Sequence, residues 1–156
     1  MSRHVLFSFD LERDFARAVE LRGRWVSRDR TAGGFAERPQ WVGIRARGRD
    51  GVLEWIDREM ERASVVVTLV GAETAGLYYV TYALEQAHER DLGVVGIRVH
   101  QMDDGLQRVG VPGYDPLDRF RDASGRRLYM THDWLPGFSD RFLGSWIEFA
   151  AEQAGL

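Results

Sequence analysis

The sequence of 156 residues contains no cysteine and no lysine, so all 21 of its basic residues are arginine. The absence of cysteine excludes disulfide bonds, thiolate nucleophiles and cysteine-ligated zinc. The absence of lysine excludes a Schiff-base lysine and a Walker P-loop, whose lysine contacts the phosphates of a nucleotide. Covalent catalysis through a thiolate or an amine is therefore beyond this chain.

An excess of charge of one sign and long apolar runs are also missing. A net charge of -3, with 29% charged residues, gives no basic surface of the kind that binds nucleic acid. The opening stretch MSRHVLFSFDLERD has an apolar run too short for a signal peptide, and no segment approaches the length of a membrane span. We therefore expect a cytoplasmic protein whose partners include neither nucleic acid nor a membrane. Because 44% of the residues are hydrophobic, residues 1–156 are predicted to form a single domain.

Patterns typical of strands and of helices alternate along the chain. Apolar runs rich in β-branched residues predict strands at 4–9, 64–71, 93–100 and 127–134, with a shorter strand and a Gly-Gly loop within 24–41. Helical spacing of apolar residues predicts helices at 11–22, 50–62, 74–90 and 139–155, the last with Ser139 as N-cap. The polar stretch 101–126 is predicted to be an irregular surface excursion. This alternation predicts a three-layer α/β fold around a mostly parallel five-stranded sheet.

Ligands of parallel α/β sheets bind beyond the carboxyl ends of the strands, near the point where the strand order reverses. This rule selects the segment Ser8-Phe9-Asp10 after the first strand and Gly71-Ala72-Glu73-Thr74 after the third. It also selects the first turns of the helix that follows, which contain Tyr79 and Tyr82.

Several chemistries found on such sheets are excluded by the residues present. A phosphoacceptor receiver domain needs an aspartate after the third strand and a late lysine, but here the third strand ends in glycine. The stretch SFDLERD is too acidic for the phosphate loop of a flavodoxin, and the dinucleotide fingerprint G-x-G-x-x-G is absent. No Ser-His-Asp triad can be assigned from spacing. No metal site is predicted, because the four histidines are widely separated, at His4, His88, His100 and His132.

The order of several motifs resembles a known family. HVLFSF comes first, followed by GGF with Trp41, then SVVVTLVGAETAG running into YVTYALEQA, and finally HDW and LGSWIEFAAEQAG. Together they resemble the bacterial TIR-like family and, more closely, the ThsB proteins of Thoeris anti-phage defence, over nearly the whole chain. The resemblance implies a flavodoxin-like TIR fold that cleaves the nicotinamide–ribose bond of NAD. NAD is then a substrate, and no cofactor is expected.

The resemblance also implies partners. Family members release a cyclic or conjugated ADP-ribose signal upon phage infection, and the signal activates a separate effector protein. A phage protein as trigger and a homo-oligomer are further partners that this reading allows.

One position departs from the family pattern. Family members read Trp-Val-x-Tyr-Glu-Ile at the start of the helix, and that glutamate is the catalytic residue that contacts the ribose hydroxyls. The matching positions here run from Tyr79 to Leu84, and Ala83 replaces the glutamate. The chain is either a natural pseudoenzyme or a deliberately inactivated variant, and the intact remainder of the pocket favours the second explanation. The competing interpretation is a non-catalytic TIR module that acts by self-association.

Two other carboxylates are candidates for part of the missing role. Glu85 is two residues from position 83, or about 200° around the helix, and is predicted to face solvent. Glu73 is better placed for a ribose hydroxyl, although an acid near a helix N-terminus also serves the helix dipole. Arg13 is a candidate for the pyrophosphate or a solvated surface residue. Trp134, which follows the last strand, is interpreted as structural.

The remaining candidates are aromatic or small residues near the strand ends. Phe9 is predicted to pack on a flat ring while Ser8 or Asp10 bonds a ribose or phosphate, the alternative being a strand end and a helix cap. Phe35 and Trp41 either stack on a nucleotide, mediate assembly or anchor their loop. The predicted NAD contacts are Ser8, Phe9, Asp10, Phe35, Trp41, Gly71, Glu73, Thr74, Tyr79 and Tyr82.

Overall fold

A computed structural model of the chain describes residues 2–156, and its centre is a five-stranded sheet. All neighbouring strands pair in parallel, in the order β2-β1-β3-β4-β5. The strands are β1 (Arg3–Ser8), β2 (Arg30–Gly33), β3 (Val65–Val70), β4 (Gly93–Arg98) and β5 (Met130–Asp133). Every residue of β3 is buried, as expected of a β-branched strand covered by helices on both faces. The predicted α/β fold of flavodoxin-like type is confirmed.

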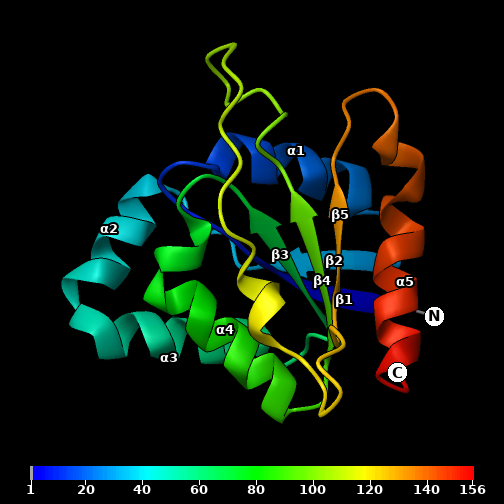
Figure 1. The fold of residues 1–156 in the computed structure, drawn as a ribbon. Coiled ribbons are helices and arrows are strands. Elements are labelled where there is room, and N and C mark those ends of the chain that lie inside the picture. The colour runs from blue at the N-terminus through cyan, green and yellow to red at the C-terminus, as the bar shows by residue number, and fades with distance from the viewer. Residues whose placement is uncertain (1) are drawn as a thin grey trace.

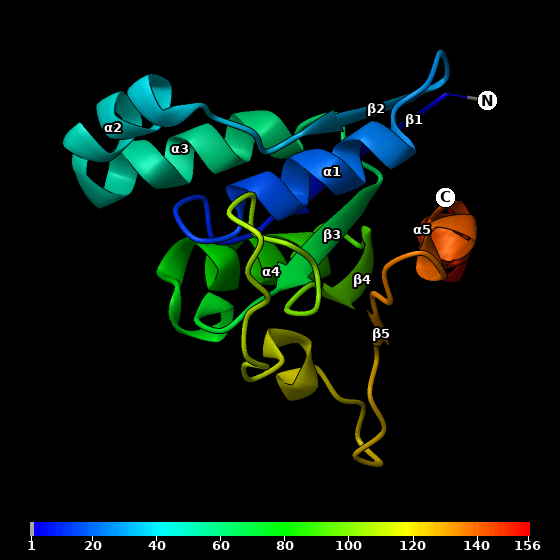
Figure 2. The same ribbon diagram turned by 90° about the horizontal axis from the view of Figure 1, so that it is seen from above.

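Helices cover both faces of the sheet and complete three layers (Figures 1 and 2). Figure 2 shows α3 and α4 on one side of the sheet and α5 on the other. α1 contacts β2 and α5, whereas α2 packs against α3 rather than against the sheet. The helices are α1 (Phe15–Trp25), α2 (Arg38–Ala46), α3 (Gly48–Met60), α4 (Tyr78–Glu89) and α5 (Leu143–Gln153). Within residues 2–156, no helix is both long and apolar enough to cross a bilayer.

Most predicted elements are confirmed, but α2 was missed. Its nine residues follow a Gly-Gly stretch and have too few apolar positions to show a helical period. The sequence there predicted only a strand and a loop. Pro39, in the first turn, is a helix-start signal that could have revealed it. α1 begins at Phe15 rather than near Leu11, because the carboxylate of Asp10 accepts the N–H groups of Glu12 and Arg13 and holds these residues in a turn.

The ends of two predicted helices also differ from expectation. The predicted helix 74–90 is a 3-10 turn (Thr74–Gly76) followed by α4, and 139–155 is a 3-10 turn (Ser139–Phe142) followed by α5. The prediction that Ser139 caps the last helix is wrong. Its hydroxyl accepts the N–H of Leu135 at 2.8 Å and donates to the carbonyl of Asp133 at 3.2 Å, so it closes the turn after β5 instead.

Gly34 is required where the chain leaves β2. Its φ is +92°, and a Cβ added there would lie 2.0 Å from the carbonyl oxygen of Phe7 in β1. The N–H of Gly34 also donates to Glu59 of α3 at 2.9 Å, which fixes this loop to the helix layer.

Gly34→Ala should therefore lower the free energy of unfolding by more than about 2 kcal/mol, since it combines a left-handed backbone with a backbone clash. Gly43→Ala is the matched control, because Gly43 lies in α2 with open space around its Cβ position. That control should be neutral or stabilising by about 0.5–1 kcal/mol. Urea unfolding of both variants checks this, and equal stabilities would contradict it.

Candidate functional site

A cavity of about 480 Å³ lies beyond the carboxyl ends of β1 and β3. These two strands flank the point where the strand order reverses, so the cavity lies where parallel sheets place their ligands. Its volume is in the range of small-molecule pockets. We call it the switch-point cavity. Its walls are Asp10, Glu12, Arg13, Trp41, Arg45, Gly48, Arg49, Glu73, Gly76, Leu77, Tyr78 and Tyr79.

Asp10 is fixed in place by the loop that follows β1. One carboxylate oxygen accepts the N–H groups of Glu12 at 3.1 Å and Arg13 at 3.0 Å. The other lies 3.5 Å from the guanidinium of Arg13. The carboxylate therefore shapes the loop and also forms part of the cavity wall, whereas the N-cap position of α1 is occupied by Asp14.

Tyr79 joins three elements at the back of the cavity. Its hydroxyl accepts the N–H of Leu11 at 3.2 Å, and its ring meets Trp41 edge-on with centroids 5.3 Å apart. Tyr78 packs against the same ring at 5.6 Å. Burial raises the pKa of the Tyr79 hydroxyl, so this group stays neutral and rigidly bonded. The result is an aromatic wall made of residues from α2 and α4.

Charged groups of both signs complete the walls. Glu12 is ion-paired with Arg45, and Arg49 lies over the ring of Tyr78 at 4.5 Å. Glu73 is exposed, and its carboxylate makes no hydrogen bond or ion pair within residues 2–156. A carboxylate can accept hydroxyls of a sugar, a guanidinium can bind phosphate, and aromatic rings can stack on a base. The cavity thus offers the three kinds of contact that a nucleotide needs.

Two predicted aromatic contacts, Phe9 in the core and the partly buried Phe35 beside it, lie outside the switch-point cavity. Phe9 is 1% exposed, and Phe35 packs against it with ring centroids 5.2 Å apart. Phe7 and Phe15 complete this cluster. Phe9 does not line the switch-point cavity, and its buried ring leaves no surface on which a ligand ring could pack. Ser8 is also buried, beside a void of only about 20 Å³.

Gly71 and Thr74 build the turn that presents Glu73. The N–H of Gly71 donates to the hydroxyl of Thr74 at 2.7 Å. A Cβ on Gly71 would lie 2.1 Å from the carboxylate of Asp14, so only glycine fits against that side chain. Both residues support the cavity without lining it.

The tyrosine assignment needs one correction. Tyr82 was predicted to frame the pocket, but its hydroxyl donates to Asp57 of α3 at 2.8 Å and it does not line the cavity. Tyr78, which was not among the predicted contacts, lines the cavity in its place. On a helix Tyr82 is about 300° from Tyr79, enough to turn it toward the neighbouring helix.

Ala83 lies one turn beyond Tyr79 and is 1% exposed. It does not line the cavity. Because helical side chains lean toward the N-terminus, a longer side chain at this position would extend toward Tyr79. Glu85 is exposed and ion-paired with Arg119 at 3.0 Å, so the expectation that it faces solvent is confirmed.

Among the charged and aromatic residues of the cavity, four were not candidates in the sequence: Glu12, Arg45, Arg49 and Tyr78. Arg45 comes from the unrecognised helix α2 and Arg49 from the start of α3. Glu12 lies in the acidic stretch after β1, where Asp10 was the only acid singled out. Tyr78 is next to Tyr79 in a predicted helix, and its sequence position alone does not show which tyrosine faces the cavity.

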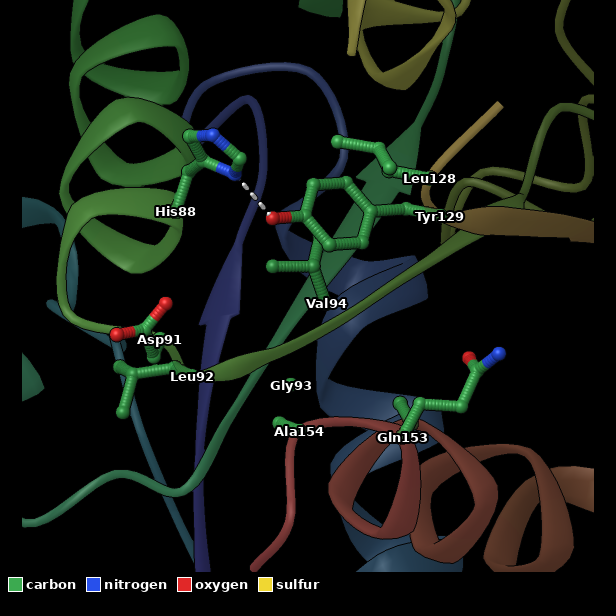
Figure 3. Close-up of a pocket in the computed structure, with 10 residues that line it drawn as sticks. His88, Asp91, Leu92, Gly93, Val94, Leu128, Tyr129, Gln153 and Ala154 are labelled. Atoms are coloured by element: carbon green, nitrogen blue, oxygen red, sulfur yellow. Dashed lines mark hydrogen bonds between the residues drawn. The ribbon is translucent and has the colours of Figure 1, made fainter. Parts of the chain in front are cut away.

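A separate cavity of about 570 Å³ lies at the opposite end of the sheet, beside Gly93 at the start of β4 (Figure 3). There Nδ1 of His88 is 2.5 Å from the hydroxyl of Tyr129. This end of a parallel sheet is not where such folds bind ligands. In the part of the chain that the structure describes, no group of three or more metal-ligating side chains comes together.

An all-parallel sheet of this strand order, covered by helices on both faces and with a cavity at its switch point, defines a flavodoxin-like α/β protein. The sequence pattern of the family described as "Thoeris protein ThsB, TIR-like domain" matches residues 6–104, and the chain belongs to this family. A relative from Bacillus cereus strain MSX-D12 is 23% identical over 143 residues, which cover 88% of this chain and 73% of the relative. That relative is named "Putative cyclic ADP-D-ribose synthase ThsB1".

The raised pKa of Tyr79 predicts how stability changes in alkaline solution. The hydroxyl ionises near its ordinary pKa of 10.0 in the unfolded chain but resists ionisation when folded. Above pH 10 stability is therefore lost as pH rises, by about 1.4 kcal/mol per pH unit until the folded pKa is reached. Tyr79→Phe should lose less stability than the parent between neutral pH and about pH 11. Urea unfolding at both pH values measures this, and identical pH dependences would contradict it.

Proposed function

We propose that the switch-point cavity binds NAD and that the chain is an NAD-processing TIR protein with a reduced rate of cleavage. The observation that carries the proposal is the meeting of an aromatic wall, an unpaired carboxylate and three guanidinium groups at the strand switch point. Family membership and the name of the Bacillus relative support the same chemistry. We propose that the low rate follows from Ala83, at the position of the family's catalytic glutamate.

The proposed reaction is dissociative. The bond between the ribose C1 and the ring nitrogen of nicotinamide breaks, and its electron pair neutralises the pyridinium. An oxocarbenium-like ribose remains, as in glycoside cleavage. A carboxylate close to this ribose stabilises the developing positive charge and holds the sugar hydroxyls. The methyl group of Ala83 can do neither.

The other walls have roles in binding. Glu73 is free to accept a ribose hydroxyl, while Arg13 and Arg49 offer guanidinium groups to the pyrophosphate. Tyr78 and Tyr79 flank a flat ring. The oxocarbenium is then captured by an internal or a second nucleophile, which gives a cyclic or conjugated ADP-ribose. We propose that this signal, in an active form of the protein, activates a separate effector during anti-phage defence.

A non-catalytic interaction module is the second candidate. The absence of a carboxylate at Ala83 favours it, and so does a row of contacting aromatic side chains from β5 to α5. His132 stacks on Trp146 at 4.3 Å, Trp146 on Phe142 at 6.2 Å, and Phe142 contacts Phe138 at 5.5 Å. Phe138 is 51% exposed, so an apolar surface is available for self-association.

Restoring the carboxylate tests the enzymatic proposal. Ala83→Glu should raise nicotinamide release from NAD by at least about 100-fold over the parent, a typical effect of one electrostatic group in a reaction centre. Ala83→Gln is the control for size, since it adds the same length without charge and should stay near the parent rate. Release is followed by chromatography. A folded Ala83→Glu protein that releases no nicotinamide would sink the proposal that only the carboxylate is missing.

Ligand-induced stabilisation separates the two candidates. If the cavity binds NAD, ADP-ribose at about 100 times its Kd should raise the melting temperature by roughly 5 °C or more. A scaffold protein would show no nucleotide effect and a mass that grows with protein concentration. Thermal unfolding with ADP-ribose and light scattering over a concentration series are the two measurements.

A further inference from the structure

A second cavity of about 640 Å³ adjoins the switch-point cavity on the side of α2 and the start of α1. Glu12, Trp41 and Arg45 belong to the walls of both cavities, so the two are neighbouring compartments. We call the second one the α2 cavity. Like the switch-point cavity, it contacts the loop after β1.

The α2 cavity has a largely apolar lining. Leu11, Phe15, Ala36 and Val42 contribute to it together with Trp41. Val42 is 58% exposed, and it lines the α2 cavity but not the switch-point cavity. Flat uncharged rings are the ligands that such a lining favours.

Trp41, which lines both cavities, has an indole N–H without a hydrogen-bond partner in the described part of the chain. The residue is 5% exposed, and its indole N–H meets no acceptor in residues 2–156. A buried donor without an acceptor costs about 1–3 kcal/mol, so such groups are rare unless a ligand or water completes them. Because an indole nitrogen can only donate, a ligand group that completes it is an acceptor. Ring nitrogens of a purine are acceptors in the plane of a flat base.

Guanidinium groups at the shared wall can meet a phosphate-linked ligand. Arg45 stands between the two cavities, where it is ion-paired with Glu12, and Arg38 begins α2 at the edge of the second. No side chain among the described residues caps the N-terminus of α2, so N–H groups in its first turn are free to bind an anion. A group that crosses from one cavity to the other therefore meets a guanidinium.

We propose that the α2 cavity binds the adenine end of the dinucleotide while the switch-point cavity holds the nicotinamide riboside. This inference rests on the proposed function. The proposed function places the reacting ribose beside Glu73, which lines the switch-point cavity only, and this assigns the adenosine half to the neighbouring compartment. The pyrophosphate crosses the shared wall beside Arg45.

A third cavity on the other side of the loop is a poorer fit for adenine. Its volume is about 520 Å³, and its walls include Arg17, His100, Asp104 and Arg108. Arg17 is committed to Asp14 at 2.6 Å and to the carbonyl of Met102 at 2.8 Å. A lining this rich in charged groups favours a polar ligand over an uncharged ring.

The test compares adenosine monophosphate and nicotinamide mononucleotide, which carry the same phosphate on different bases. Val42→Glu places a charge in the apolar wall of the α2 cavity and, at an exposed helical position, leaves the fold intact. It should weaken adenosine monophosphate binding at least about tenfold and leave nicotinamide mononucleotide unchanged. Gln40→Glu is the control, because it adds the same charge to α2 at an exposed residue that lines neither cavity. Both ligands should bind this control as they bind the parent.

Trp41→Phe is the second variant, since it removes the N–H donor and keeps an aromatic ring. In calorimetric titrations, this variant too should weaken the binding of adenosine monophosphate more than the binding of nicotinamide mononucleotide. Equal binding of adenosine monophosphate to the parent and Val42→Glu, or an equal loss of both ligands, overturns the adenine assignment. NAD binding to the parent in the same titrations then shows that the proposed function stands. A parent that binds neither NAD nor ADP-ribose overturns both proposals.

Discussion

The hydrogen bond from the Leu11 N–H to the Tyr79 hydroxyl is the contact on which the geometry of the cavity depends. It ties α4 to the loop after β1, two segments 68 residues apart in the sequence. Trp41 of α2 then packs on the same ring, so a third element is positioned by the first two. Because the hydroxyl is buried, this bond competes with little water and holds the aromatic wall at a fixed distance from Asp10. The arrangement explains how loops of a parallel sheet can form a defined site without a metal cluster or disulfide in the described residues.

Much of the fold could be predicted because each β-branched run corresponds to one strand of the sheet. β3 is the clearest case, since a strand buried on both faces has no polar positions to confuse its pattern. The strand-end rule then selected candidate site residues before any side chain was located. Asp10, Glu73 and Tyr79 were predicted on this basis and Trp41 from the family resemblance, and all four line one cavity in the structure.

The parts that could not be predicted depend on contacts between distant segments. Tyr78 and Tyr82 are both amphipathic residues on one helix, and only the position of Asp57 on α3 shows which of them turns away from the cavity. Phe9 and Phe35 look like loop aromatics in the sequence, but they face each other across β1 and the Gly-Gly turn. α2 was missed because nine residues give too few apolar positions to establish a helical period.

The burial of Ala83 beneath Tyr79 separates the residues that hold the fold from the residue that would drive the reaction. The aromatic wall, the guanidinium groups and Glu73 do not depend on a side chain at this position. Under the proposed function, such a cavity without a catalytic carboxylate would bind the dinucleotide and leave most of it intact, so binding and turnover would be separable properties of the chain.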